Sequence, residues 1–276
     1  MEKSNICALA AAIFVLSGFA QGELVPPVPE TAEVPIIMYH SLAGSGKSTA
    51  ISGEAFEKDL QYLQESGYEA VTLQALAAFV HQGEALPKKP VLLTFDDGYY
   101  NNYSVGFPLI KQYDTPIVIS IIGKDTEIWS EIPAKDEKNG HLTWDEIREM
   151  AETGLVEIAN HTWDLHKTEG GRKGVAMKAG EDRAQYREML REDIGRLQES
   201  LAQNSGVHPI AFTYPFGKTC PEATEELARM GFYATLACHD GMNILLQGDA
   251  PSLFELHRYN RTPERSLEEI LTGAKT

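Results

Sequence analysis

The sequence is poor in cysteine, in basic residues and in long apolar runs. Its 276 residues include three cysteines, too few for a disulfide-rich scaffold. Lysine and arginine total 24 against 40 aspartates and glutamates, and the formal net charge of −16 disfavours binding to nucleic acid or to anionic lipid. No apolar run reaches the roughly 20 residues that cross a bilayer. The chain is long enough to bury one full hydrophobic core. Its negative charge favours a neutral or cationic binding partner.

Residues 1–20 have the features of a secretory signal peptide. Lys3 precedes an apolar run at residues 6–19, and Gly18-Phe19-Ala20 forms a small-x-small cleavage pattern before Gln21. We therefore expect export to the cell envelope or the medium, with no stable membrane insertion after cleavage. The proline-rich residues 21–35 predict an extended linker, and residues 36–276 a single folded domain.

Cysteine usage is consistent with export. Cys7 would leave with the signal peptide, so the mature chain would keep Cys220 and Cys238. In an oxidising compartment these two thiols either form a disulfide or stay as two small unpaired side chains. The sequence leaves both possibilities open.

Strand-like and helix-like segments alternate along the predicted domain. Apolar, strand-like runs occur at residues 36–39, 68–73, 91–95, 117–122, 155–159, 210–214 and 233–238, with a last segment around 254–259. Helical patterns lie between them, including a capping box at residues 143–146 and a long polar helix at about 182–203. Such alternation predicts parallel β/α units in an α/β barrel, whose chemistry lies at the C-terminal ends of the strands.

The segment Val91–Gly98, V-L-L-T-F-D-D-G, ends a buried strand with two adjacent carboxylates. Two such charges repel each other in a partly dry site unless a cation lies beside them or one is protonated. A metal would remove the conflict, with one aspartate as ligand and the other as the base that takes a proton from water. The alternative is that Asp96, Asp97 and Gly98 form only a turn.

Two histidines follow a second predicted strand. His161 and His166 lie in A-N-H-T-W-D-L-H, residues 159–166. On a helix they would be about 140° apart around the axis, so only a loop can bring them together. Combined with the carboxylates at the same edge of the sheet, they complete an Asp/His/His set with open coordination positions. His81, His141 and His208 are interpreted as surface residues.

A third strand ends in F-T-Y-P-F-G, residues 212–217. The tight turn at Pro215 and Gly217 would direct the backbone N–H of Phe216 toward a developing oxyanion, while the rings of Tyr214 and Phe216 line a groove. The same residues also form an ordinary turn. His40 ends the first predicted strand and is a further candidate to line the site.

The segment A-G-S-G-K-S-T, residues 43–49, is not a phosphate-binding loop. The full pattern requires a glycine at the position of Ser41, and the next helix begins too late, near Glu54. We expect a surface loop and no bound nucleotide.

Taken in order, five of these segments resemble the polysaccharide deacetylases of carbohydrate esterase family four, the NodB-homology enzymes. The segments are Y-H at 39–40, T-F-D-D-G at 94–98, L-T-W-D-E-I at 142–147, N-H-T-W-D-L-H at 160–166 and Y-P-F-G at 214–217. The resemblance covers about residues 34–262. The wide H-T-x-x-x-H spacing is similar to that of the poly-N-acetylglucosamine deacetylase branch.

The resemblance implies a fold and a set of roles. The fold would be a distorted (β/α) barrel of about seven parallel strands. Asp97, His161 and His166 would be the ligands of one divalent metal, and Asp96 the catalytic base. Zn²⁺ is expected, although Co²⁺, Ni²⁺ or Mn²⁺ also suit such a site.

The sequence departs from the family pattern at two positions. The commoner third motif has an arginine, which helps to orient the base, where this chain has Thr213. We expect Arg258, just after the last predicted strand, to supply that charge. Many relatives place a proton-donating histidine in a final L-x-H motif. Here His257 directly follows Leu256, so it is near that position but one residue too early. His257 is therefore a candidate acid, with His239 and a metal-bound water as alternatives.

The resemblance implies a hydrolase that removes N-acetyl groups from N-acetylglucosamine-containing polysaccharide and releases acetate. Poly-N-acetylglucosamine, peptidoglycan and chitin-like oligomers are all candidate substrates. One alternative is a metal-dependent esterase or amidase acting on another acylated molecule. Another is an inactive relative that only binds glycan.

Overall fold

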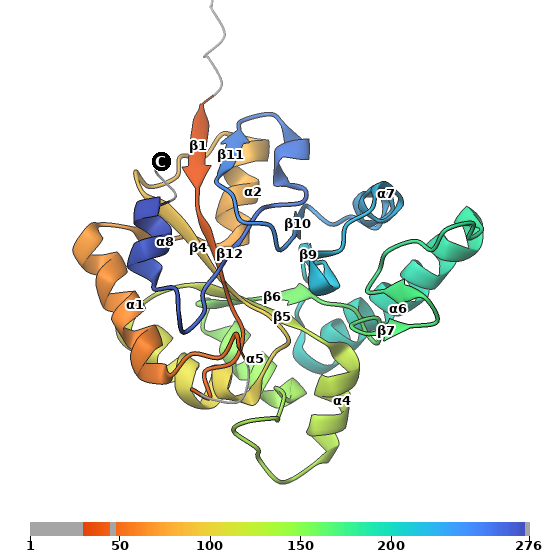
Figure 1. Cartoon of the computed structure of the whole chain (residues 1–276), viewed down its shortest axis with the longest axis horizontal. Helices are drawn as coiled ribbons and strands as arrows, with labels where there is room; N and C mark the ends of the chain where they lie inside the picture. The colour runs from red at the N-terminus through yellow and green to blue at the C-terminus, as the bar shows by residue number, and fades with distance from the viewer. Residues whose placement is uncertain (1–29, 45–47, 274–276) are drawn as a thin grey trace, which may run out of the picture.

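The computed structural model describes residues 30–44 and 48–273 (Figure 1). The predicted signal peptide and residues 21–29 of the predicted linker lie outside the described residues. Within the described part of the chain, no helix is both long enough and apolar enough to cross a membrane.

One parallel sheet forms the centre of the fold. Seven strands follow one another in the order β10-β9-β6-β5-β4-β2-β12, and the short β3 pairs beside β4. The sheet is curled into a half-barrel, so the prediction of a distorted barrel of about seven parallel strands is confirmed. The strands are β2 (Ile36–Tyr39), β3 (Glu69–Ala70), β4 (Pro90–Phe95), β5 (Ile117–Ile121), β6 (Val156–Asn160), β9 (Ala211–Thr213), β10 (Ala234–Leu236) and β12 (Tyr259–Asn260).

Helices cover the sheet, with α1 and α8 at one side and α6 and α7 at the other (Figure 1). They are α1 (Gly53–Ser66), α2 (Leu73–Gln82), α3 (Phe107–Tyr113), α4 (Gly123–Glu131), α5 (Trp144–Glu152), α6 (Arg183–Ser205), α7 (Pro221–Arg229) and α8 (Leu267–Gly273). The predicted capping box is present at α5, where Thr143 and Glu146 each bind the other's backbone N–H.

Strand β4 is buried on both faces because its successive side chains enter two different cores. Val91, Leu93 and Phe95 pack in the core that includes α1, α3, α5 and α8. Leu92 points the other way, into a core that contains the apolar face of α2. A run of apolar residues without alternation is what a central parallel strand requires. The two cores fix β4 in place, and with it the carboxylates that follow.

The structure differs from the predicted linker in the linker's last part. Thr31–Val34 forms strand β1, which pairs antiparallel with β11 (Asn243–Leu246). Val34 is fully buried, and the Asn243 side-chain amide donates a hydrogen bond to its carbonyl oxygen. Residues 31–34 therefore belong to the folded domain and not to an extended linker.

A short hairpin, β7 (Thr168–Glu169) and β8 (Arg172–Lys173), follows the second histidine of the predicted site.

Cys220 and Cys238, for which the sequence left two possibilities, are both free thiols.

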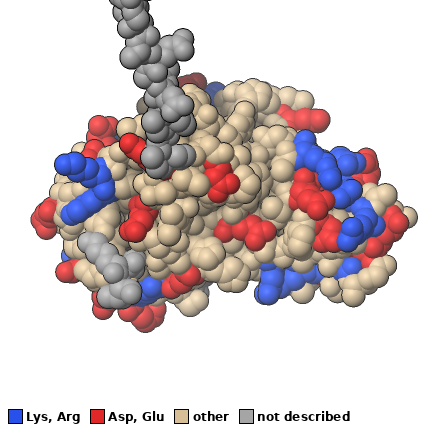
Figure 2. Space-filling view, turned by 90° about the horizontal axis from the view of Figure 1, so that it is seen from above, with Lys and Arg blue, Asp and Glu red and all other residues tan. Residues whose placement is uncertain are grey.

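Charged side chains of both signs lie side by side at one end of the molecule. Figure 2 shows Lys and Arg mixed with Asp and Glu at the end where α6 and α7 lie. The buried Glu226 of α7 is bound there by arginines of both helices, Arg187, Arg191 and Arg229. Ion pairs at this end therefore link the two helices.

Candidate active site

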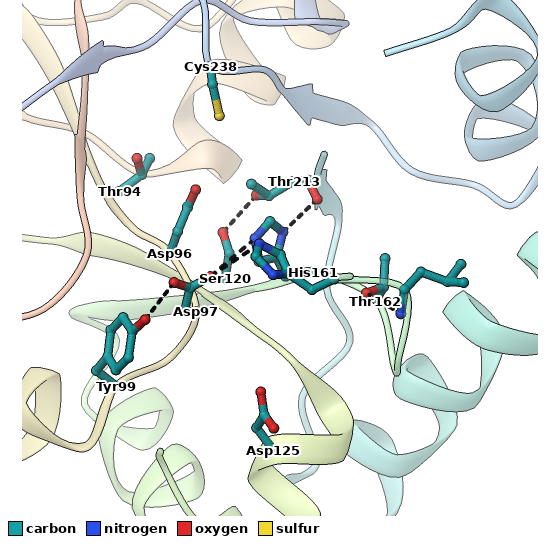
Figure 3. Close-up of polar contacts among 12 residues, drawn as sticks. Thr94, Asp96, Asp97, Tyr99, Ser120, Asp125, His161, Thr162, Thr213 and Cys238 are labelled. Carbon is teal, nitrogen blue, oxygen red and sulfur yellow. Dashed lines mark hydrogen bonds and ion pairs between the residues drawn. The ribbon is translucent and has the colours of Figure 1, made fainter. Parts of the chain in front are cut away.

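Three side chains from two strand ends form a cluster of metal-ligand type. Asp97 follows β4, and His161 and His166 follow β6. One ligand atom from each lies within 4.8 Å of the other two. Oδ1 of Asp97 is 3.6 Å from Nε2 of His161 and 3.5 Å from Nε2 of His166. Figure 3 shows Asp97 and His161 facing each other.

The donor atoms fit a divalent cation. Oδ1 of Asp97 is buried and has no hydrogen-bond partner among the described residues. Nδ1 of His161 lies 2.7 Å from the carbonyl oxygen of Thr213, which can only accept, so the ring proton is on Nδ1. That leaves the lone pair of Nε2 directed at Asp97. A cation bound by these three residues would give the buried carboxylate oxygen a partner.

The backbone at Asp97 and Gly98 has a conformation that few residue types adopt. Asp97 and Gly98 both have left-handed conformations, with φ of 70° and 67°. A Cβ on Gly98 would lie only 3.0 Å from Cγ2 of Ile121. Glycine fits because it tolerates both the positive φ and the close approach of β5. The turn after β4 thus directs both aspartates into the site.

Asp96 is held as an ion by Arg258. Both guanidinium Nη atoms donate to its carboxylate at 2.7 Å, and both side chains are almost completely buried. Burial alone would raise the pKa of Asp96, but the charge and hydrogen bonds of Arg258, helped by His161 and His40, hold it well below its usual value. Arg258 is fixed in turn by Ala237 and Thr94, whose oxygens accept from it.

The arginine that binds Asp96 does not come from the segment around Thr213, where the commoner family motif has one. The side chain of Thr213, at the end of β9, makes a 2.7 Å hydrogen bond with Ser120 of β5 (Figure 3). The carboxylate of Asp96 is bound by Arg258 instead. The structure therefore places Arg258 where the sequence analysis expected a substitute charge.

Tyr214 does not line a groove, so that prediction is wrong. The side chain is fully buried, and its hydroxyl contacts Thr224 of α7 while its ring packs on Phe212. Phe216 is 40% exposed, with its ring centroid 4.4 Å from that of His166. Of the two aromatic residues, only Phe216 is accessible beside the cluster.

His40, predicted to line the site, and His257, the predicted candidate acid, have different surroundings. His40, at the end of β2, is among the groups that most lower the pKa values of Asp96 and Asp97, and its Nδ1 is buried with no hydrogen-bond partner among the described residues. His257 is exposed and its ring lies 6.4 Å from that of His239, which is also exposed. Of the two, His40 is the one whose ring nitrogen is buried and without a hydrogen-bond partner among the described residues.

Two neighbours of Asp97 were not predicted as site residues. Tyr99 donates a hydrogen bond from its hydroxyl to Oδ2 of Asp97 at 2.9 Å. Nδ1 of His141 lies 2.9 Å from the backbone oxygen of Asp97, and the side chain is only 14% exposed, so its interpretation as a surface residue is wrong. Tyr99 adjoins D-D-G in sequence and could have been proposed; His141 depends on a tertiary contact that no local pattern shows.

Comparison with known proteins identifies the relatives of this arrangement. A family profile described as polysaccharide deacetylase matches residues 83–235. Poly-beta-1,6-N-acetyl-D-glucosamine N-deacetylase of Escherichia coli K12 is 29% identical over 227 residues, covering 75% of this chain and 34% of that protein. The chain thus spans about a third of the length of the E. coli relatives it matches.

Two solved structures have a similar fold. IcaB from Ammonifex degensii superposes with a TM-score of 0.72 at 28% identity, covering 88% of this chain and 97% of that one. A de-N-acetylase from Aggregatibacter actinomycetemcomitans gives a TM-score of 0.74 at 26% identity, with coverages of 87% and 99%.

Proposed function

The chain belongs to the polysaccharide deacetylase family, and on that premise we propose that it is a metal-dependent hydrolase of N-acetylated glycans. It removes N-acetyl groups from N-acetylglucosamine-containing polysaccharide and releases acetate. The observation that carries the proposal is the cluster of Asp97, His161 and His166 beside an ionised, buried Asp96.

Each residue of the cluster has a role that follows from its geometry. Asp97, His161 and His166 hold the metal. A bound divalent cation supplies Lewis acidity, which polarises an acyl carbonyl and lowers the pKa of a nearby water. Asp96 takes a proton from the attacking water, because Arg258 keeps its carboxylate charged and oriented.

Two further residues complete the reaction. Water adds to the acetamide carbon, the C–N bond breaks, and the sugar nitrogen needs a proton to leave as an amine. His40 is the proposed donor of that proton, because its buried Nδ1 has no hydrogen-bond partner among the described residues. The exposed ring of Phe216 lines the site beside His166, and its backbone N–H is the proposed oxyanion donor.

Zinc is the proposed native metal. Two imidazole nitrogens and one carboxylate oxygen are a donor set that catalytic zinc sites use, with a position left open for substrate. Cobalt, nickel and manganese tolerate the same donors, so metal analysis of the purified protein is needed to choose among them.

The proposed substrate class rests on the relatives. The E. coli protein is named for poly-β-1,6-N-acetyl-D-glucosamine, and a β-1,6-linked oligomer is therefore the first glycan to test. A net charge of −16 is compatible with a neutral glycan and attracts a polymer that becomes cationic as acetyl groups are removed.

The proposal is tested by measuring metal content and acetate release together. The protein without residues 1–20, its Asp97→Asn variant and a control, Asp164→Asn, are assayed with β-1,6-linked N-acetylglucosamine oligomers. Asp164 lies in the same loop as the histidines, but pairs with Lys124 and Lys167 near the surface. We expect about one metal per chain and acetate release in the parent and the control, both lost in Asp97→Asn.

Two results would replace the proposal. Acetate released from an acetylated xylan but not from the oligomers would make the chain an esterase. Glycan binding without metal or acetate release would make it an inactive binding protein.

We also propose that the chain is exported, on the basis of residues 1–20. Expression of the full chain in a bacterial host, followed by fractionation, should give a mature protein outside the cytoplasm that begins at Gln21. Cytoplasmic protein with an intact N-terminus would contradict export.

A further inference from the structure

The carboxylate and the backbone carbonyl of Asp97 each accept a hydrogen bond from a side chain that is not a proposed metal ligand. The Tyr99 hydroxyl donates to its carboxylate oxygen Oδ2 at 2.9 Å. Nδ1 of His141 lies 2.9 Å from its backbone carbonyl oxygen, which can only accept, so the histidine donates. Figure 3 shows Asp97 between Tyr99 on one side and His161 on the other.

The two carboxylate oxygens of Asp97 consequently have different surroundings. Oδ2 is occupied by the tyrosine hydroxyl. Oδ1 faces His161 and His166 at 3.6 and 3.5 Å, and it is the buried oxygen without a hydrogen-bond partner in the described part of the chain. The side chain thus offers one oxygen to a cation at the cluster and keeps the other engaged.

Tyr99 is itself fixed by the segment that precedes α5. Its side chain is 6% exposed, and its ring centroid lies 5.1 Å from that of His141. The backbones of Tyr99 and His141 form a β-bridge, and Leu142 donates a backbone hydrogen bond to Gly98 at 2.8 Å. The hydroxyl is therefore held at Oδ2 by a rigid frame and needs no reorganisation to bind there.

We propose that Tyr99 is a positioning residue that restricts Asp97 to one-oxygen coordination of the metal and thereby sets metal affinity and coordination number. A free carboxylate binds a cation through one oxygen or through both. With Oδ2 held by Tyr99, only Oδ1 is available, and the position that a second oxygen would take stays open for water and substrate. This inference rests on the proposed function, because it presumes that the cluster binds a metal.

The experiment compares Tyr99→Phe with a matched control, Tyr103→Phe. Both variants keep the ring and remove one hydroxyl that donates to a carboxylate; Tyr103 donates to Glu149 near the surface, at 2.8 Å. Zn²⁺ dissociation constants are measured by competition with a chromophoric chelator, and the visible absorption of the Co²⁺-substituted proteins is recorded.

Tyr99→Phe should bind Zn²⁺ roughly 10- to 100-fold more weakly than the parent, and Tyr103→Phe should match the parent. The Co²⁺ absorption of Tyr99→Phe should lose intensity, because a second carboxylate oxygen raises the coordination number. Thermal unfolding of the metal-free variants, expected at similar midpoints, separates positioning from a general loss of structure.

Three results would overturn the inference. If Tyr99→Phe keeps the parental affinity and spectrum, the inference fails while the metal site and the proposed function stand. If only its thermal midpoint falls, the role of Tyr99 is structural. If the parent itself binds neither ion, the inference and the proposed function fall together.

Discussion

Asp96 and Arg258 form an ion pair that is 3% and 0% exposed. Taking both charges out of water costs free energy that their attraction only partly offsets, so such a pair is weak support for stability. Its consequence for chemistry is clearer. Burial raises the pKa of Asp96, but the charge and hydrogen bonds of the guanidinium, together with His161 and His40, hold it well below its usual value, so the carboxylate is ionised and can accept a proton at neutral pH.

Replacing Arg258 by lysine should slow turnover and change its pH dependence. Lysine keeps the charge but cannot donate two parallel hydrogen bonds to one carboxylate, so Asp96 loses orientation and its pKa rises. We expect kcat to fall about 100-fold and the acid limb of kcat/KM to move to higher pH, because the base must then be deprotonated at a higher pH. Acetate release from pH 4 to 9 measures both.

Arg261 provides the matched control for Arg258. It binds Asp59 through two hydrogen bonds of 2.8 and 3.2 Å and is 6% exposed, away from Asp96. Arg261→Lys should lower thermal stability and leave the pH profile unchanged. Parental kcat and pH profile in Arg258→Lys would remove Arg258 from the mechanism.

His40 and His257 should differ in their effect on catalysis. His40→Asn should lower turnover of an N-acetylated oligomer by about 10²- to 10⁴-fold, the usual contribution of a general acid. Its effect on p-nitrophenyl acetate should be much smaller, since that leaving group departs without a proton. His257→Ala should behave as the parent on both substrates. An equal loss on both substrates in His40→Asn would show that His40 is not the proton donor.

Among the elements, α5 connects the fold to the site. Its capping box at Thr143 and Glu146 fixes the start of the helix, directly after the segment whose His141 holds the backbone of Asp97. Thr143→Ala should lower the free energy of unfolding of the metal-free protein by about 1 kcal/mol, whereas Thr143→Ser keeps the cap. Urea denaturation measures the difference, and equal losses in the two variants would contradict the role of the side-chain oxygen.

Elements with a strong local pattern could be predicted from the sequence. The apolar run before Asp96 gives β4, and the polar helix expected at 182–203 is α6, Arg183–Ser205. Strand β1 could not be predicted, because its partner β11 is more than 200 residues away and the prolines on either side of it favour a linker. Pairing of distant segments depends on the assembled fold, which no local pattern encodes.

The candidate site divides in the same way. Asp96, Asp97, His161 and His166 follow strands, so the topology alone brings them to one edge. Tyr214 also follows a strand, yet its side chain points into the core around α7. Which face a residue takes at the end of a strand depends on where the strand stops, because successive side chains alternate.

For the whole molecule, the burial of His161 predicts how stability depends on pH. Burial lowers its pKa to about 4, despite the opposing charges of Asp96 and Asp97. The unfolded chain, with an ordinary histidine pKa of about 6.5, binds a proton at pH values where the folded metal-free protein does not, so stability rises with pH across this window.

The contribution of His161 is therefore fully present above about pH 6.5 and is lost as the pH falls toward 4, by roughly 3 kcal/mol in total. Urea unfolding of the chelator-treated protein from pH 4 to 8 measures it as the difference between the parent and His161→Gln, which removes the titrating ring. His208→Gln, which removes an exposed histidine, serves as the control. A parallel dependence in the parent and in His161→Gln would mean that His161 takes up its proton at the same pH in the folded protein as in the unfolded chain. Below that pH the protonated ring has no lone pair on Nε2, so the metal-free cluster would lack one of its three donors.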